Sequence, residues 1–153
     1  MPESQKILDR KAILALVPHQ GASCLLDTVC CWDSQRIICE SRAHLLARNP
    51  YRISGRLPAV CAVEFAAQCF ALHAALKAGT AVTPSSHRHG YLASVRSLAL
   101  LVNTLDECSG TLRIEAEELS AGQDGMLYSF GLQHQDVWIA RGRAAVAFVP
   151  GVQ

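Results

Sequence analysis

The chain has 153 residues, of which half are hydrophobic and 18% are charged, a balance typical of one globular domain with its own core. A formal net charge of +1 argues against bulk electrostatic binding of nucleic acid. The first ten residues lack the apolar stretch of a secretory signal, so we expect a cytoplasmic protein whose seven cysteines are reduced thiols.

The first half of the chain contains a short helix, two strands and a long loop. Residues 9–16 predict the helix, which ends before a proline. Residues 25–32 and 36–43 have strand character and are joined by a turn around Asp33-Ser34. The loop over 44–58 is long for a compact domain, and loops of this kind are often functional.

An apolar run then predicts one long helix over 59–78, with Pro58 near its first turn and Gly79 just past its end. A helix so apolar is expected to be buried inside the fold. Its polar interruptions argue against a membrane span. They are Glu64, Gln68, His73 and Lys77.

The carboxylate in the middle of this run is the most informative residue of the sequence. At about 100° per residue, Gln68 lies beside Glu64 on one helix face, while His73 lies on the opposite face and is expected to be structural. A buried, unpaired carboxylate is costly. A catalytic role for Glu64 is therefore the leading explanation, with a hydrogen-bonded structural carboxylate as the alternative.

The second half of the chain is mostly strand. We expect a four-strand antiparallel meander that follows the helix, with a hairpin turn at Gln123-Asp124-Gly125. Its strands cover residues 91–102, 111–119, 126–134 and 137–149. One sheet can bury such a helix only by curling around it. The predicted fold class is α+β, a single hot-dog domain over 1–153 in which one long helix is wrapped by a curled antiparallel sheet.

Several segments, covering nearly the whole length, resemble the β-hydroxyacyl-acyl-carrier-protein dehydratases, and in particular the subgroup associated with aryl-polyene biosynthesis. They are LVPHQGASCLLDTV at 16–29, NPYR at 49–52, GRLPAVCAVEFAAQ at 55–68 and GYLASV at 90–95. The helix motif is the most specific of them. The resemblance implies dehydration of 3-hydroxyacyl thioesters to trans-2-enoyl thioesters, in fatty-acid-like or polyene chain synthesis, without a cofactor or a metal.

The resemblance also implies a histidine that works with Glu64. His44 is the nearest candidate before the helix, although it lies further from Glu64 in the sequence than is usual in that family. His19, just after Pro18, is interpreted as a packing residue of the N-terminal segment. Ala59 stands where the family usually has glycine, which would narrow the pocket while keeping the backbone N–H group.

Dehydration next to a thioester carbonyl requires a base, an acid and donors for the developing enolate oxygen. His44 titrates near neutral pH and suits the proton transfer. Burial would favour the protonated form of Glu64, which could then act on the departing hydroxyl. The first N–H groups of the helix, near Val60 and Cys61, are the expected donors to the carbonyl oxygen. Gln68 would position Glu64.

Other polar residues leave alternatives open. Arg48, Arg52 and Arg56 could contact the acidic face or the phosphopantetheine phosphate of a carrier protein, or form a solvated basic face. A nucleophilic Cys61 or Cys69 is a minor possibility.

Two classes of function follow. The first is a dehydratase acting on chains bound to an acyl carrier protein. The second is a non-catalytic hot-dog subunit of a heteromeric dehydratase. Within the enzyme class, an acyl thioesterase is a further alternative, because related folds carry several thioester chemistries. We expect a homodimer, or a heterodimer with another hot-dog chain, because a single curled sheet leaves its edge strands exposed.

Overall fold

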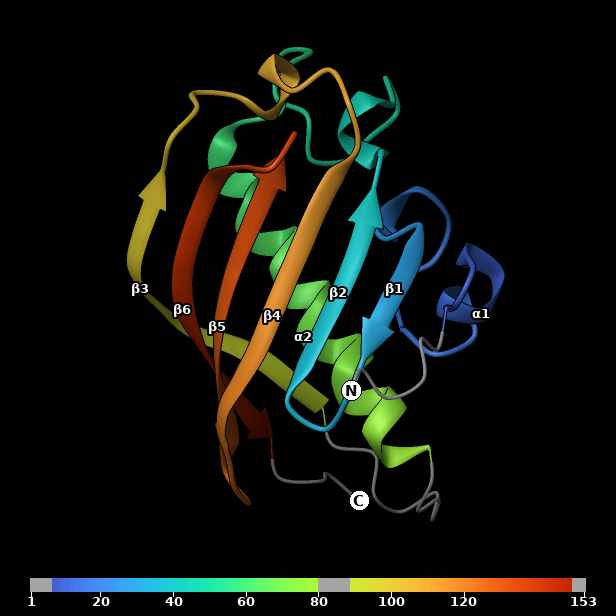
Figure 1. Ribbon diagram of the computed structural model, residues 1–153, viewed down its shortest axis with the longest axis vertical. Coiled ribbons are helices and arrows are strands. Elements are labelled where there is room, and N and C mark those ends of the chain that lie inside the picture. Colours follow the sequence, from blue (N-terminus) through green and yellow to red (C-terminus); the bar gives the residue numbers. More distant parts are fainter. Residues whose placement is uncertain (1–6, 80–88, 150–153) are drawn as a thin grey trace.

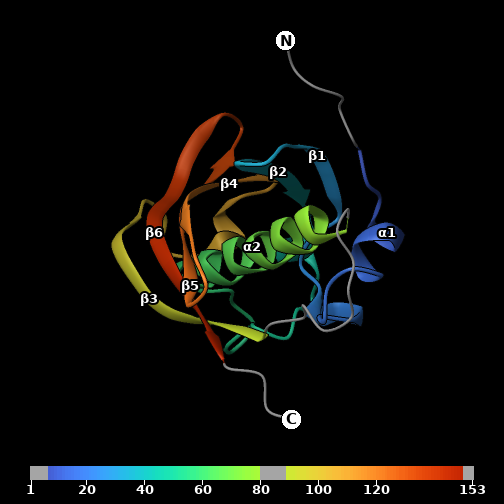
Figure 2. The same cartoon turned by 90° about the horizontal axis from the view of Figure 1, so that it is seen from below.

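The computed structural model describes residues 7–79 and 89–149, and in them one antiparallel sheet curves around one long helix (Figures 1 and 2). The strands are β1 Thr28–Trp32, β2 Arg36–Ser41, β3 His89–Leu100, β4 Leu112–Ala121, β5 Gly125–His134 and β6 Val137–Val149. The helices are α1 Arg10–Leu14 and α2 Ala62–Ala78. Short 3₁₀ turns lie at Gly21–Ser23, Ala43–Leu45, Ala59–Cys61 and Leu105–Glu107. The α+β architecture is the predicted one.

The order of the strands corrects one prediction. The six strands are ordered β1-β2-β4-β5-β6-β3, so that β3 pairs with β6 at the far edge and β4 lies between β2 and β5. Only β4, β5 and β6 form the expected meander. The connection over 101–111 is too long for a tight hairpin, and it carries the chain across the top of the sheet from β3 to β4 (Figure 1).

Helix α2 fills the concave side of the sheet, as the view along the molecule shows (Figure 2). Its 3₁₀ first turn follows Pro58, and Gly79 is its C-cap, so the predicted helix over 59–78 is confirmed. By length and composition Ala59–Ala78 resembles a membrane span. Its packing explains the apolar composition instead, because Phe65, Phe70 and Leu72 are fully buried against the sheet.

The strands alternate inward and outward side chains, as the sequence pattern predicts. On β5, Tyr128, Phe130 and Leu132 face the helix, and the Tyr128 ring stacks on Phe70 with centroids 4.5 Å apart. The intervening residues of β5 face outward, away from α2. The helix and the inner face of the sheet therefore share one core.

Candidate active site

Glu64 is the third residue of α2 and lies at the end of the helix that follows the long loop. Its side chain is 32% exposed, which corrects the expectation of a buried carboxylate. The Gln68 side chain, one turn along the helix, donates a hydrogen bond to Glu64 Oε2 at 3.2 Å. The same amide bonds the backbone of Ser23 and Leu25, so its orientation is fixed by three contacts. The predicted positioning of Glu64 by Gln68 therefore has a structural basis.

The histidine beside this carboxylate is His19. Its Nε2 lies 3.6 Å from Glu64 Oε2, and its Nδ1 is buried without a hydrogen-bond partner among the described residues. The sequence predicts a packing role for His19, and the structure places it beside Glu64. The one indication in the sequence was its place in the motif after Pro18.

The segment that carries His19 is held rigidly. Arg10 of α1 donates hydrogen bonds to the carbonyl oxygens of Gly21, Cys24 and Leu26 at 2.8–3.1 Å. The Gln20 side chain donates to the carbonyl oxygens at the end of α1. These contacts fix the segment to α1, while the Gln68 bonds to Ser23 and Leu25 tie it to α2 near Glu64, a proximity that sequence spacing could not show.

Tyr51 is a further residue of the site that sequence analysis missed. Burial, together with the charge of the neighbouring Glu64 carboxylate and a hydrogen bond to it, raises the pKa of the Tyr51 hydroxyl. The Tyr51 N–H donates to Asn49 Oδ1 at 2.9 Å, which fixes the backbone of the loop at this point. Glu64 is thus surrounded by His19, Gln68 and Tyr51.

His44 lies elsewhere. It is fully buried, and its Nε2 donates to the carbonyl oxygen of Cys108 at 2.9 Å. Its Nδ1 has no hydrogen-bond partner among the described residues. Burial is the main cause that lowers its pKa, and its charged neighbours are His134 and Arg42. Within the described residues no contact joins His44 to Glu64, so the structure does not bring together the pair predicted from the sequence.

Two buried histidines make the stability pH-dependent. His73, like His44, is fully buried, and burial lowers its pKa. In the unfolded chain both titrate near pH 6.5, so the unfolded state binds more protons below that value. We therefore expect the free energy of unfolding to fall as the pH drops below about 6.5, by at most about 1.4 kcal/mol per pH unit for each residue. Urea titrations between pH 7.5 and 5 measure this loss.

A His44→Gln variant serves as the control, because its amide can still donate to Cys108 and does not titrate. Its stability should fall less steeply over the same pH range than that of the wild type. An identical dependence of stability on pH in the two proteins would contradict the assignment of part of this dependence to His44.

The turn before α2 offers fewer free N–H groups than predicted. The Ala59 N–H donates to the carbonyl oxygen of Asn103 at 3.1 Å, and the Cys61 N–H donates to Pro58 at 3.0 Å. This corrects the expected donor role of Cys61 and leaves the N–H of Val60 as the candidate donor. Val60 is 54% exposed, and it precedes Glu64 by one helical turn.

The three loop arginines differ in their surroundings. The side chain of Arg52 is only 13% exposed and donates to Asp106 and to the carbonyl oxygens of His44, Leu46 and Gly55. Arg52 is therefore a structural residue, which corrects its assignment to carrier binding. Arg48 and Arg56 are exposed.

Cys61 and Cys69 do not have the properties of nucleophiles. All seven cysteines are unpaired, and Cys24, Cys39, Cys69 and Cys108 are buried. Burial raises the pKa of Cys61 and, more strongly, that of Cys69, so their thiolates are disfavoured. In residues 7–79 and 89–149, no group of three His, Cys, Asp or Glu side chains is placed to hold a metal ion.

A match over nearly the whole chain identifies the protein family. The ApeP-like family, described as ApeP dehydratase, matches residues 11–151. The chain belongs to the ApeP-like dehydratase family. No curated protein matches the sequence.

Solved structures that resemble this ApeP-like chain have the hot-dog fold. The dehydratase heterocomplex ApeI:P from Xenorhabdus doucetiae matches with a TM-score of 0.76 and 17% identity, over 90% of this chain and 91% of that one. A mutant of the thioesterase PA1618 from Pseudomonas aeruginosa matches with a TM-score of 0.56 and 15% identity, over 80% and 81%. A hypothetical thioesterase with coenzyme A from Streptococcus pneumoniae TIGR4 matches with 0.53 and 10%, over 82% and 87%. At these identities the likeness establishes the fold.

Proposed function

We propose that this chain dehydrates 3-hydroxyacyl thioesters carried by an acyl carrier protein to trans-2-enoyl thioesters, in cytoplasmic chain synthesis of the fatty-acid or aryl-polyene kind. The observation that carries the proposal is the pair of His19 Nε2 and Glu64 Oε2, 3.6 Å apart and each about one-third exposed. A base and an acid at this spacing can act on neighbouring carbon atoms of one substrate. Family membership supports a dehydratase.

In the proposed reaction, the reacting form has the proton of the pair on Glu64, and neutral His19 Nε2 takes the proton from the carbon next to the thioester carbonyl. The carbon–oxygen bond at the next carbon breaks, a proton from Glu64 goes to the departing hydroxyl, and water leaves as the double bond forms. The N–H of Val60 would hold the carbonyl oxygen while negative charge develops on it. The proton on His19 then returns to Glu64 across the gap between them, which restores both groups without any cofactor.

Gln68 and Tyr51 would hold the Glu64 carboxyl in place through their hydrogen bonds. We assign the base to His19 rather than to His44, because the His44 ring is enclosed and already bonded to Cys108. Exposed Arg48 and Arg56 border the loop that precedes the site, and we propose that they contact the carrier protein.

The sheet edge at β3 is the proposed contact with another hot-dog chain. Its outer edge is unpaired in the order of strands, and it exposes Tyr91, Leu92, Leu98 and Leu100. An exposed apolar edge strand is a ready template for pairing. The solved relative is a heterocomplex, which supports a partner chain of the same fold.

Charge on this edge should therefore disrupt the assembly. We expect Leu98→Glu with Leu100→Glu to halve the mass of the particle in light scattering, because carboxylates cannot be buried in an apolar contact without large cost. Leu119→Glu, an exposed leucine of β4, is the matched control and should leave the mass unchanged. An unchanged mass in the double variant would exclude β3 as the contact.

Mass spectrometry of a carrier-bound 3-hydroxyacyl substrate tests the proposed function. A dehydratase leaves the thioester intact and removes one water, whereas a thioesterase releases the free acid. Product that forms only after addition of a second hot-dog subunit would favour the non-catalytic alternative, which the heterocomplex relative also supports. Release of free acid, or no reaction in either case, would contradict the proposal.

A further inference from the structure

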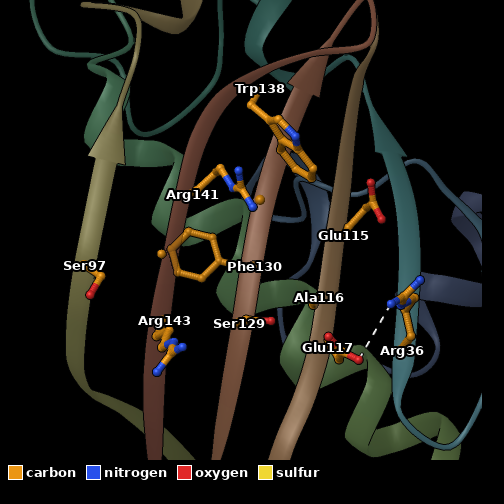
Figure 3. Close-up of a pocket in the computed structure, with 12 residues that line it drawn as sticks. Arg36, Ser97, Glu115, Ala116, Glu117, Ser129, Phe130, Trp138, Arg141 and Arg143 are labelled. Carbon is orange, nitrogen blue, oxygen red and sulfur yellow. Dashed lines mark ion pairs between the residues drawn. The ribbon is translucent and has the colours of Figure 1, made fainter.

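The outward face of the sheet carries a hollow of about 480 Å³ that takes no part in the proposed reaction (Figure 3). It lies over β4, β5 and β6, on the side of the sheet away from α2. Trp138 and Arg141 border it at one end, and Arg143 and Glu117 lie toward the other end (Figure 3). A hollow rimmed by an aromatic ring and arginines has the composition of a protein–protein contact.

The charges on this face follow the register of the strands. Two successive outward rows each run from an acid on β4, through a small residue on β5, to an arginine on β6. The rows are Glu117–Ser129–Arg143 and Glu115–Gly131–Arg141. One side of the face therefore carries two acids, which have arginine neighbours of their own, and the other side carries two arginines, with a neutral central strand between them.

The basic side lacks compensation within the chain. Arg96 of β3 is directly opposite Arg143 in the register of β3 and β6, and like charges placed so are destabilising. Among the described residues, no ion pair involves Arg96, Arg141 or Arg143. These arginines are thus available to carboxylates from outside the chain.

We propose that this face binds the same face of a second copy of the chain, around a two-fold axis parallel to β5. Such an axis places the β4 of one copy over the β6 of the other and leaves each row at its own height. Glu117 of each copy then meets Arg143 of the other, and Glu115 meets Arg141. The contact is isologous, and its charges are complementary in both rows.

The centre of the contact carries an aromatic ring. Ser129 has a small side chain, but the Trp138 ring covers β5 at Gly131, so the two Trp138 rings, and not the two β5 strands, would meet near the axis. Gly131 leaves room for the Trp138 ring, because a Cβ there would lie 2.2 Å from Trp138 Cζ3. Arg141 already lies over that ring, with its Cζ 4.8 Å from the centroid.

A third row of outward residues is also complementary between the two copies, through a cation and an aromatic ring. Arg113 on β4 and Trp138 on β6 are both opposite Gln133 of β5. The two-fold axis brings Arg113 of one copy to Trp138 of the other, a cation–π arrangement. The acids already have partners within the chain, Arg36–Glu117 at 3.7 Å and Arg113–Glu115 at 3.6 Å. These distances are long and the side chains are 26–52% exposed, so each pair contributes little and can be shared with or replaced by an arginine of the second copy.

Charge reversal tests the proposal by sedimentation velocity on the full chain, purified with any partner that remains bound. Arg141→Glu with Arg143→Glu should halve the mass of the particle, and so should Glu115→Arg with Glu117→Arg. Each variant repels its own copies. An equimolar mixture of the two should regain the wild-type mass, because every acid then faces an arginine.

Arg48→Glu with Arg56→Glu, compared with the wild type in samples free of carrier protein, is the matched control, since it makes the same change of charge away from this face and should keep the mass. Combining the face reversal with the β3 variant should give the smallest particle. The proposal is overturned if folded reversal variants keep the wild-type mass, or if the mixture does not recover it. The proposal is also overturned if the reversal variants still self-associate but no longer bind a different, acidic protein that co-purifies with the wild type.

Discussion

Glu64→Gln should reduce turnover on a carrier-bound 3-hydroxyacyl thioester by roughly 10²–10⁴, with the fold intact. The amide keeps the shape of the side chain and its contacts with Gln68 and Tyr51, but it has no proton to give to the departing hydroxyl. Because the carboxyl is 32% exposed, the melting temperature should change little. Steady-state kinetics with thermal unfolding as a control measures both effects.

His19→Ala should lose activity to a similar extent, and the double variant should be little worse than either single one, because paired acid and base groups act as a unit. Glu40→Gln, a carboxylate on β2 outside the site, is the matched control and should keep full activity. Full activity in folded Glu64→Gln would end the enzymatic account, while additive losses would show that the two residues act separately.

Arg52→Ala should lower the free energy of unfolding by about 1.5–3 kcal/mol, the range for loss of hydrogen bonds that involve a charged group. The guanidinium donates to Asp106 at 2.6 Å and to three carbonyl oxygens of the loop. Asp106 in turn accepts from the Leu57 N–H at 2.7 Å, directly before the start of the helix. Removing Arg52 therefore releases the loop that carries Tyr51 and the turn that carries Val60.

Arg52→Lys should recover only part of this stability, because an ammonium group cannot reproduce the planar fork. Arg56→Ala, an exposed arginine of the same loop, should leave the stability within about 0.5 kcal/mol of the wild type. Denaturant titrations of the three variants and the wild type measure these free energies of unfolding. Equal stability of the Arg52→Ala and Arg56→Ala variants would show that Arg52 does not organise the loop.

Arg52 also holds the pKa of Asp106 below its usual range, together with the Leu57 N–H. A lowered carboxyl pKa contributes stability above the unfolded value near 3.9, and this contribution is lost as the pH falls through the lower folded value. That range lies below the one in which His44 and His73 act. The two effects are therefore separable in a pH titration of stability.

The features that sequence analysis predicted correctly depend on local pattern. Pro58 and Gly79 bound the helix, and the spacing of Glu64 and Gln68 places both on one face. The outward and inward residues of β5 follow simple alternation. The position of β3 could not be read in this way, because pairing with β6 depends on where the long connection over 101–111 leads the chain.

The incorrect predictions about the site likewise concern contacts between distant parts of the chain. His19 lies beside Glu64 in a segment that Gln68 of α2 ties to the helix through Ser23 and Leu25, contacts between distant parts of the sequence. His44 and Arg52 have residue types that suit catalysis and carrier binding, but burial and backbone hydrogen bonds assign them to the structure of the loop. Residue type and spacing indicated the chemistry, whereas tertiary packing selected the residues.

Exchange of the proton next to the carbonyl tests the central claim, that His19 and Glu64 of one chain form the acid–base pair. In heavy water, the reverse reaction on a carrier-bound 2-enoyl thioester should place one deuterium on the carbon next to the carbonyl. His19→Ala should abolish this incorporation, and His44→Gln should retain it. Incorporation that persists without His19 and disappears without His44, in folded proteins, would contradict the account.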